Sequence, residues 1–421
     1  MRFVLVFDNI WFTTLMQLVG LRLMKIMIIS YWTCPWTRFG ELSAGGLNVY
    51  VVNLANHLAR LGHFVDVYTR KHKEEEDRRL KIEKKVRIIH LSQDSPDLFK
   101  DTHKFADKIL QSMKKNRFSY DIIYAHFYYS GLVGIVLRER LFLPLFFTFH
   151  SLGIRELDVD LKYPEREIKE KAIAERVDKI IASTDFERKD LIQYYQAQKE
   201  KIVIIPPGVE HGIFKKYPKN DCRKRLDLPS NEKIILFVGR IDPNKGISFL
   251  VKAVKKFISK YSFRDNLQVL LIGGNIKARY FWSHPEVKRL KILISENALS
   301  CCVKFIGSKP YDLLPYYYCA SDIVVVPSIY ESFGLVILEA LACGSCIVAS
   351  KVGGVPDLIE DKVDGRLFEK GNIVQLSRIL NDLLCDEKEM KRLGDNGMFK
   401  SKLFSWEKQA GKVIEVFQDY L

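Results

Sequence analysis

The chain has 421 residues, 48% of them apolar and 28% charged, a composition that excludes disordered, collagen-like and multispanning membrane proteins. At about 150 residues per domain, this length predicts two or three domains, each with its own core. Eight cysteines are too few for a disulfide scaffold.

The net charge of +15 is shared by both halves of the chain. We therefore interpret this charge as a solvated surface, with attraction to an anionic substrate or to an acidic membrane face as alternatives. No helix-turn-helix, zinc-finger or RNP-like pattern occurs, so no nucleic-acid partner is expected.

Residues 1–23 form an apolar N-terminal extension. Asp8 and Asn9 interrupt it and Arg22 closes it, so it does not provide the roughly 20 apolar residues of a spanning helix. It also has no clear small-residue cleavage site. Two interpretations follow: an upstream extension with Met24 as the natural start, or a segment that lies on a membrane surface.

From residue 25 onward, short apolar runs alternate with longer amphipathic stretches. Strands of continuous Val, Ile and Leu character separated by helices are typical of a parallel sheet covered on both faces. In the first half we predict strands at residues 25–30, 64–69, 86–90, 122–126, 145–150, 179–183 and 202–205, and helices at 46–61, 105–117, 130–140 and 166–177. The mixed-charge run at 70–79 is interpreted as a solvated loop or helix surface.

The pattern then starts again. A strand at residues 233–239 and a helix at 246–261 are followed by strands at 268–273, 303–306, 323–326 and 346–350. The boundary between the two α/β units falls at Pro206-Pro207-Gly208, which cannot continue a strand ladder. We therefore predict domains at 24–207 and 208–404, with a final helix at 405–421 that packs either on the second domain or back on the first.

The densest signal lies at residues 327–340, where a strand leads into a helix. No Lys or Arg occurs between residues 322 and 340, so a helix N-terminus here would suit a diphosphate. Glu331 precedes the helix and Glu339 lies about two turns into it, which separates them by about 12 Å along the axis. One carboxylate could then lie near a sugar and the other near a ribose, with neither anchoring the core. The alternative is an amphipathic helix whose Glu residues face solvent.

Three other features have both a structural and a functional interpretation. Gly45-Gly46 allows close backbone approach to a ligand at the start of a helix predicted to begin at Asn48, or it is an ordinary βα turn. Arg240 and Lys245 follow a strand, where two cations could stabilise a diphosphate leaving group, or they are surface charges. His150 ends a strand, and taken alone it favours a structural role.

Some patterns are not interpreted as sites. Asp158 and Asp160 have an Asp-x-Asp spacing that suits a metal, but they lie in a charged stretch that does not end an apolar strand. Cys343 and Cys346 form a single C-x-x-C, whereas zinc needs four ligands. Gly353-Gly354 is a turn and does not match the dinucleotide-binding fingerprint.

The motifs together resemble those of retaining glycosyltransferase family four, the glycosyl transferases group 1, from Met24 to near the end of the chain. Glu331 and Glu339 match the E-x7-E motif of that family, with the usual Phe-Gly after the first Glu. The other matching segments, in order, are 44–52, 150–153, 205–209 and 237–246, which resemble the first glycine loop, the segment that approaches the sugar, the hinge and the donor-phosphate loop. The chain is most similar to the subgroup of sucrose-phosphate synthases, sucrose synthases and the mycothiol glycosyltransferase.

The resemblance implies the GT-B architecture, with two Rossmann-like domains that face each other across a cleft: an acceptor-side domain at 24–207 and a nucleotide-sugar-binding domain at 208–404. It implies transfer of a hexose from a UDP-sugar or GDP-sugar to an acceptor hydroxyl, with retention of configuration and without a metal or other cofactor. The residues that carry over are His150, Arg240, Lys245 and Glu331 for catalysis; Gly46, Gly239, Arg240, Lys245, Phe333, Gly334, Leu335 and Glu339 for the donor; and Asn48, Ser151 and Arg166 on the acceptor side.

Within this family resemblance, the acceptor stays open. The branch that uses phosphorylated acceptors has Tyr where this chain has Phe127, which cannot donate a hydrogen bond, although Arg166 matches a basic position of that branch. A sugar, a sugar phosphate and a glycolipid or growing polysaccharide are all compatible, in the cytoplasm or at the inner membrane face. Two alternatives from other classes are a sugar-nucleotide epimerase on the same fold and a non-catalytic nucleotide-sugar binder.

Overall fold

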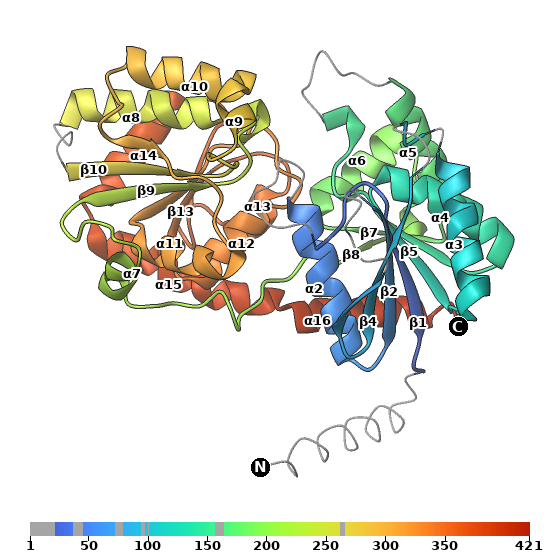
Figure 1. Cartoon of the computed structure of the whole chain (residues 1–421). Coiled ribbons are helices and arrows are strands. Elements are labelled where there is room, and N and C mark those ends of the chain that lie inside the picture. The colour runs from blue at the N-terminus through green and yellow to red at the C-terminus, as the bar shows by residue number, and fades with distance from the viewer. Residues whose placement is uncertain are drawn as a thin grey trace, which may run out of the picture.

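The computed structural model describes residues 22–36, 45–71, 79–93, 97–99, 101–155, 164–261 and 266–421, and the statements below concern these residues. They form two α/β domains that lie side by side (Figure 1), each with one central sheet. This confirms the fold class predicted from the alternation of strands and helices.

The sheet of the first domain has eight strands in the order β3-β4-β2-β1-β5-β6-β7-β8. All neighbours are parallel except β3 and β4. The strand order reverses between β1 and β5, which makes this a doubly wound sheet. Its strands are β1 (Lys25–Ser30), β2 (Phe64–Arg70), β3 (Arg79–Glu83), β4 (Val86–Leu91), β5 (Ile122–His126), β6 (Leu145–Thr148), β7 (Lys179–Ala182) and β8 (Ile202–Ile204).

Helices cover both faces of this sheet. One face packs against α3, α4 and α5, through side chains such as Phe105, Val133 and Ile173. The other face packs against α2, through side chains such as Leu54 and Leu58. The helices of the domain are α2 (Gly46–Arg60), α3 (Thr102–Asn116), α4 (Tyr128–Leu141), α5 (Pro164–Arg176) and α6 (Asp185–Tyr195).

The second sheet has six parallel strands in the order β11-β10-β9-β12-β13-β14, the strand order of a dinucleotide-binding fold. Its strands are β9 (Lys233–Val238), β10 (Leu267–Ile272), β11 (Val303–Phe305), β12 (Ile323–Val326), β13 (Cys346–Ser350) and β14 (Arg366–Phe368). Its helices are α7 (Lys219–Arg225), α8 (Ile247–Tyr261), α9 (Arg279–Ser283), α10 (Pro285–Glu296), α11 (Leu314–Ala320), α12 (Leu335–Ala342), α13 (Val355–Leu358), α14 (Ile373–Leu384) and α15 (Glu387–Ser401).

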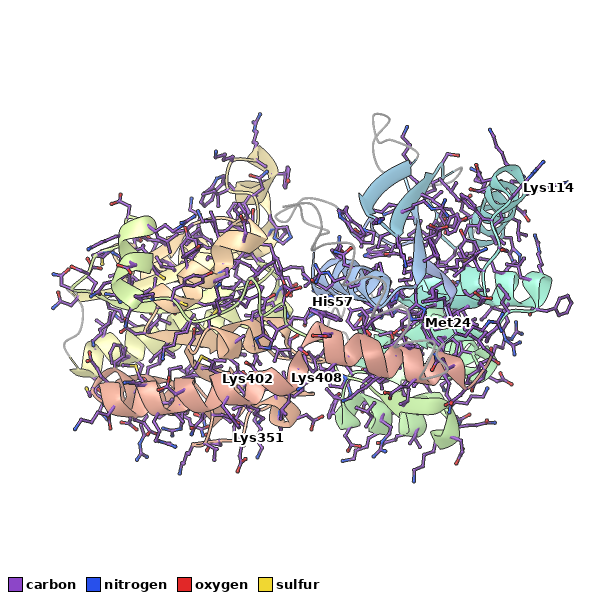
Figure 2. All side chains as sticks on the ribbon, turned by 90° about the horizontal axis from the view of Figure 1, so that it is seen from below. Met24, His57, Lys114, Lys351, Lys402 and Lys408 are labelled. Carbon is purple, nitrogen blue, oxygen red and sulfur yellow. The ribbon has the colours of Figure 1, made fainter. Side chains whose placement is uncertain are left out.

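The last helix, α16 (Trp406–Gln418), leaves the second domain and runs along the underside of the first (Figures 1 and 2). Its buried side chains Trp406, Val413 and Phe417 belong to the same core cluster as Tyr124 and Phe146 of the first sheet. It therefore does not simply pack on the second domain, which was one of the two interpretations of residues 405–421.

The chain passes between the domains twice, and the two crossings lie against each other. Val209 pairs with Ser405, and the Val209 amide donates to the Phe404 carbonyl at 2.7 Å. A Cβ atom on Gly208 would lie 2.5 Å from the Trp406 backbone, so only glycine allows the crossings to approach this closely.

The predicted elements agree with the structure except at some ends and for several elements that were not predicted. The strand predicted at 145–150 ends at Thr148, because His150 has a left-handed φ of +64° that a strand cannot accommodate. Helix α2 begins at Gly46, as in the predicted range 46–61, and not at Asn48, since the Asn48 amide already donates to the Gly45 carbonyl. Strands β3 and β14 were not predicted, and neither were helices α6, α7, α13, α14 and α15.

None of the helices in the described ranges is long and apolar enough to cross a membrane. Residues 1–21, on which the membrane-surface interpretation depends, lie outside those ranges.

Candidate active site

The site residues of the second domain lie where its strand order reverses. Neighbouring strands β9 and β12 have their carboxyl ends at the same sheet edge, and crevices at such a switch point are where open α/β sheets bind ligands. The loop after β9 carries Arg240 and Lys245, and the loop after β12 carries Glu331. The predicted motifs therefore meet at one edge of one sheet.

These two loops contact each other through backbone atoms. The Ile329 amide donates to the Asn244 carbonyl at 2.7 Å. Gly246 has a φ of +61°, and a Cβ atom there would lie only 2.0 Å from the Pro327 carbonyl oxygen. Any other residue at 246 would push the loops apart, so this glycine holds the segment with Lys245 against the segment with Glu331.

Lys245 and Glu331 form the centre of the site. The Lys245 Nζ lies 2.7 Å from Glu331 Oε2, and the Ser328 hydroxyl donates to the same oxygen at 3.2 Å. Both partners are largely covered, with 22% and 15% of their side chains exposed. A partly buried ion pair of this kind provides a cation and an acceptor at the same place, which suits a ligand with both phosphate and hydroxyl groups.

Arg240 is placed differently. It follows Gly239 at the end of β9, its side chain is 59% exposed, and its guanidinium pairs with Asp242 at 3.2 Å. The two predicted phosphate-binding cations thus share a loop, but the structure pairs each with its own carboxylate. The guanidinium remains accessible to a ligand that approaches this edge.

Helix α12 starts at this edge and faces the first domain. Gly334 caps it with a φ of +100°, and the helix begins at Leu335. The ring of Phe333 is buried against Phe404. A Cβ atom on Gly46 would lie 3.4 Å from Leu335 Cδ1, so the N-terminus of α2 meets that of α12 (Figure 1). Two positive helix ends at one place favour an anionic group between them.

Glu339 departs from the prediction that it lies two turns into the helix and does not belong to the core. It is the fifth residue of α12, just over one turn from the start, and only 5% of it is exposed. Its Oε2 accepts a hydrogen bond from the hydroxyl of the fully buried Tyr318 at 2.8 Å. Burial raises the pKa of Glu339 to about 7, against the opposing effect of the tyrosine hydroxyls. The solvent-facing alternative is wrong for this residue.

His150 presents its ring to the first domain and its backbone to the second. Its Nε2 lies 3.1 Å from Nδ1 of His126, and its ring contacts Tyr50 edge-on at 4.9 Å. Burial lowers the pKa of His150 to about 3, so the imidazole is neutral at neutral pH. The His150 carbonyl accepts a hydrogen bond from the Ser332 hydroxyl at 3.0 Å, which crosses from the second domain to the first.

The acceptor-side residues lie at the carboxyl edge of the first sheet and are engaged with protein groups. Arg166 pairs with buried Glu170 at 2.8 Å and donates to both the carbonyl and the hydroxyl of Ser151 at 3.1 Å. Its guanidinium also lies 4.7 Å from the Tyr128 ring centroid. Asn48 is buried and donates to the Cys34 carbonyl at 2.8 Å. Arg166 and Ser151 therefore come together as one unit, and Glu170 compensates the charge.

Three further residues were not singled out from the sequence. Ser332 lies inside the recognised motif, but its cross-domain bond depends on the position of His150. Tyr318 is one of three consecutive tyrosines in α11, and the sequence does not indicate which of them reaches Glu339. Tyr330 lies beside Glu331 and within the electrostatic influence of Glu187 and Arg155 in the first domain.

The cysteine and aspartate patterns do not add a metal centre among the described residues, where no three His, Cys, Asp or Glu side chains come together as ligands. Cys343 caps the end of α12 and Cys346 begins β13, and both are free, buried thiols. Asp158 and Asp160 lie outside the described residues.

The chain matches two family models that divide it as the domains do. Residues 44–212 match the model of glycosyltransferase family 4, and residues 218–398 match that of glycosyl transferases group 1. The D-inositol 3-phosphate glycosyltransferase of Corynebacterium jeikeium is 33% identical, over 94% of this chain and 97% of that protein. The enzyme of the same name from Thermobispora bispora is 31% identical, over 95% and 96%.

Solved structures agree in fold. Sucrose-phosphate synthase from Thermosynechococcus elongatus superposes with a TM-score of 0.85 at 32% identity, and the match covers 94% of this chain and 99% of that one. The Anabaena protein HepE, determined in complex with UDP, superposes with a TM-score of 0.75 at 22% identity, over 94% and 100%.

Two facing α/β domains with a charged site at the switch point thus define a glycosyltransferase of the GT-B architecture. Within that class, the chain belongs to glycosyltransferase family four, the glycosyl transferases group 1. The family predicted from the motifs is confirmed, including its similarity to both sucrose-phosphate synthase and the inositol-phosphate glycosyltransferases.

Proposed function

We propose that this glycosyltransferase moves a hexose from a nucleotide sugar to an acceptor hydroxyl, with retention at the anomeric carbon and without a metal ion. The observation that carries the proposal is the Lys245–Glu331 pair at the switch point of the second sheet, 2.7 Å apart and largely covered. A donor there would place its diphosphate beside a cation and its sugar hydroxyls beside a carboxylate.

The departing diphosphate is stabilised by groups of the chain. Lys245 and Arg240 supply two cations, and the amides of residues 333–336, where the chain enters α12, supply donors at the positive end of that helix. The N-terminus of α2 at Gly46 approaches the same place from the first domain. These charges act most strongly as negative charge develops on the leaving group, so they lower the barrier more than they strengthen ground-state binding.

The two motif carboxylates have different tasks. Glu331 accepts hydrogen bonds from the donor hexose, while Glu339 binds the ribose hydroxyls from its position within α12. Ribose binding requires that donor hydroxyls replace part of the hydrogen bonding that Tyr318 now provides to Glu339. Such an exchange of partners stabilises the ionised carboxylate in a site whose burial otherwise disfavours the charge.

His150 acts as a neutral group near the reacting carbon. Its lowered pKa keeps the imidazole uncharged, so it provides a polar contact to the hexose and does not act as a proton donor at neutral pH. Retention then proceeds by front-face attack, in which an oxygen of the leaving phosphate accepts the proton of the acceptor hydroxyl as the new bond forms.

The donor nucleotide is proposed to be UDP, with GDP as the alternative, because HepE was determined with UDP and with UDP-glucose. For the acceptor, the relatives named for D-inositol 3-phosphate support a phosphorylated polyol. The compensation of Arg166 by Glu170 and the missing hydroxyl at Phe127 support a neutral sugar or glycolipid instead.

The test is a screen of UDP-, GDP- and ADP-hexoses with inositol phosphates, free sugars and glycolipids, in excess chelator. Mass spectrometry identifies the product, and the coupling constant of its anomeric proton in NMR gives its configuration. A retained linkage with release of nucleoside diphosphate supports the proposal. An inverted linkage, or an epimerised donor with no transfer to any acceptor, contradicts it.

A peripheral contact with an acidic membrane is a further part of the proposal, motivated by the net charge of +15. Co-sedimentation with vesicles that contain about 30% phosphatidylglycerol, compared with vesicles of neutral lipids, tests this membrane contact. Equal binding to both kinds of vesicle contradicts an electrostatic contact.

A further inference from the structure

The chain segment that contains Glu331 lies between the two domains. Both of its neighbours in the sequence face the first domain. The Ser332 hydroxyl donates to the His150 carbonyl at 3.0 Å. Tyr330 is partly buried, and burial together with the carboxylates of Glu187 and Asp190 raises the pKa of its hydroxyl. Glu331 itself turns back to Lys245 of its own domain.

Backbone atoms of the second domain pack closely against the segment that contains Glu331. The Gly354 amide donates to the Glu331 carbonyl at 3.0 Å. A Cβ atom on Gly353, whose φ is +52°, would lie 2.0 Å from that same carbonyl oxygen, and one on Gly354 would lie 2.5 Å from Cγ2 of Thr184 in the first domain. The segment therefore has little room to move independently of either domain while the domains are in contact.

On the other side, the acceptor of the Ser332 bond is held in one orientation. His150 has a left-handed backbone with a φ of +64°, which is unfavourable for a residue with a Cβ atom. Such a conformation persists only where its surroundings enforce it. Its ring is fixed by His126 and Tyr50, so the carbonyl points consistently toward the second domain.

We propose that Ser332 is a positioning residue, and that its bond to the His150 carbonyl couples closure of the two domains to the orientation of Glu331. The inference rests on the proposed function, since it assigns Glu331 to the donor hexose. When the two domains separate, Ser332 loses its partner, and the Glu331 segment is held by the second domain alone. When the domains close, the hydrogen bond from Ser332 to His150 fixes the Glu331 carboxylate beside the reacting carbon. The same bond brings His150 to that carbon.

Two serines flank Glu331 and allow a matched comparison. The Ser332 hydroxyl bonds across the domains, whereas the buried Ser328 hydroxyl bonds to Glu331 Oε2 within the second domain. Ser332→Ala and Ser328→Ala make the same chemical change, so they separate the cross-domain contact from the support of the carboxylate. Ser332→Thr keeps a hydroxyl and serves as the conservative variant.

Hydrogen–deuterium exchange of the full chain, without ligand and with UDP, measures closure. In Ser332→Ala, we expect exchange about fivefold faster in peptides spanning residues 150–155, 183–190 and 329–334, the faces that closure covers, because about one neutral hydrogen bond is lost. Exchange there should match wild type in Ser328→Ala and return toward wild type in Ser332→Thr. Unchanged exchange in Ser332→Ala, or an equal increase in both alanine variants, overturns the proposal.

Kinetics provide the second readout. Ser332→Ala should lower kcat/KM for the donor about fivefold or more, and Ser332→Thr should recover most of it. Faster exchange in Ser332→Ala with wild-type kinetics overturns the link to Glu331. If the wild-type chain transfers no hexose from any nucleotide sugar, the proposed function fails, and the exchange comparison still decides whether Ser332 controls closure.

Discussion

Replacing Glu339 by Gln should change how the stability of the second domain depends on pH. Burial raises the pKa of this carboxyl from its ordinary 4.5 to about 7 in the folded chain. The folded state therefore binds the proton more tightly than the unfolded state. The stability that this provides is fully present below about pH 4.5 and is lost as the pH rises through 7. Gln cannot ionise, and its carbonyl can still accept the hydrogen bond from Tyr318.

The size of the effect follows from the shift. Each pKa unit corresponds to about 1.4 kcal/mol, so wild type loses about 3 kcal/mol between pH 5 and 8.5 that the variant does not lose. For a domain of this size, 1 kcal/mol changes the Tm by about 2–4 °C, which predicts a relative change of roughly 6–12 °C. Burial also raises the pKa of Glu187 to about 7. Glu187 lies in the first domain and is present in both wild type and Glu339→Gln, so it does not contribute to the difference between them.

Differential scanning calorimetry across this pH range is the assay, and Glu360→Gln, at an exposed carboxyl near α13, is the matched control. Glu339→Gln should melt above wild type at pH 8.5 and lose that advantage near pH 5, while Glu360→Gln should follow wild type throughout. Parallel curves of Tm against pH for wild type and Glu339→Gln would show that the buried carboxyl does not ionise as argued.

Three further predictions concern activity. Lys245→Ala and Arg240→Ala should each lower turnover about 10²-fold at saturating donor, and wild-type turnover in both would remove the assignment of the phosphate-binding loop. Glu331→Ala should mainly lower kcat, whereas Glu339→Ala should mainly raise the donor KM. Steady-state kinetics on the folded variants measures both constants. The same changes in kcat and KM in both variants would contradict the division of roles. Hexose transfer should persist in excess chelator. If the chelator abolishes transfer and magnesium or manganese restores it, the reaction requires a metal.

Sequence reasoning predicted most of the fold because parallel strands are buried on both faces. Strands such as Ile122–His126 and Ile323–Val326 are continuous apolar runs, so composition alone identifies them. Strand Arg79–Glu83 pairs at the sheet edge and alternates charged with apolar residues, and it follows a charged run interpreted as solvated. Helix Asp185–Tyr195 was missed because it is strongly polar, although its Thr184 cap precedes Glu187 at capping-box spacing.

The sequence predicted the site residues that belong to recognisable motifs, but not the contacts that tertiary packing gives them. Lys245 and Glu331 were both predicted to contact a donor, and the strand order brings the two side chains together. The burial of Glu339 depends on Tyr318, which is 21 residues away along the chain, and no local pattern encodes such a contact. His150 was predicted from the motif, yet its left-handed backbone and its pairing with His126 arise from tertiary packing.

The return of α16 to the first domain has a consequence for synthesis on the ribosome. The first sheet is translated by residue 204, but Trp406, Val413 and Phe417, which fill one face of its core, are translated only after the whole second sheet. Until α16 has been translated, that face with Tyr124 and Phe146 has no cover from it. The first domain is thus completed only after the second has been translated, and a stop codon between residues 401 and 406 would leave an apolar face of the first domain exposed.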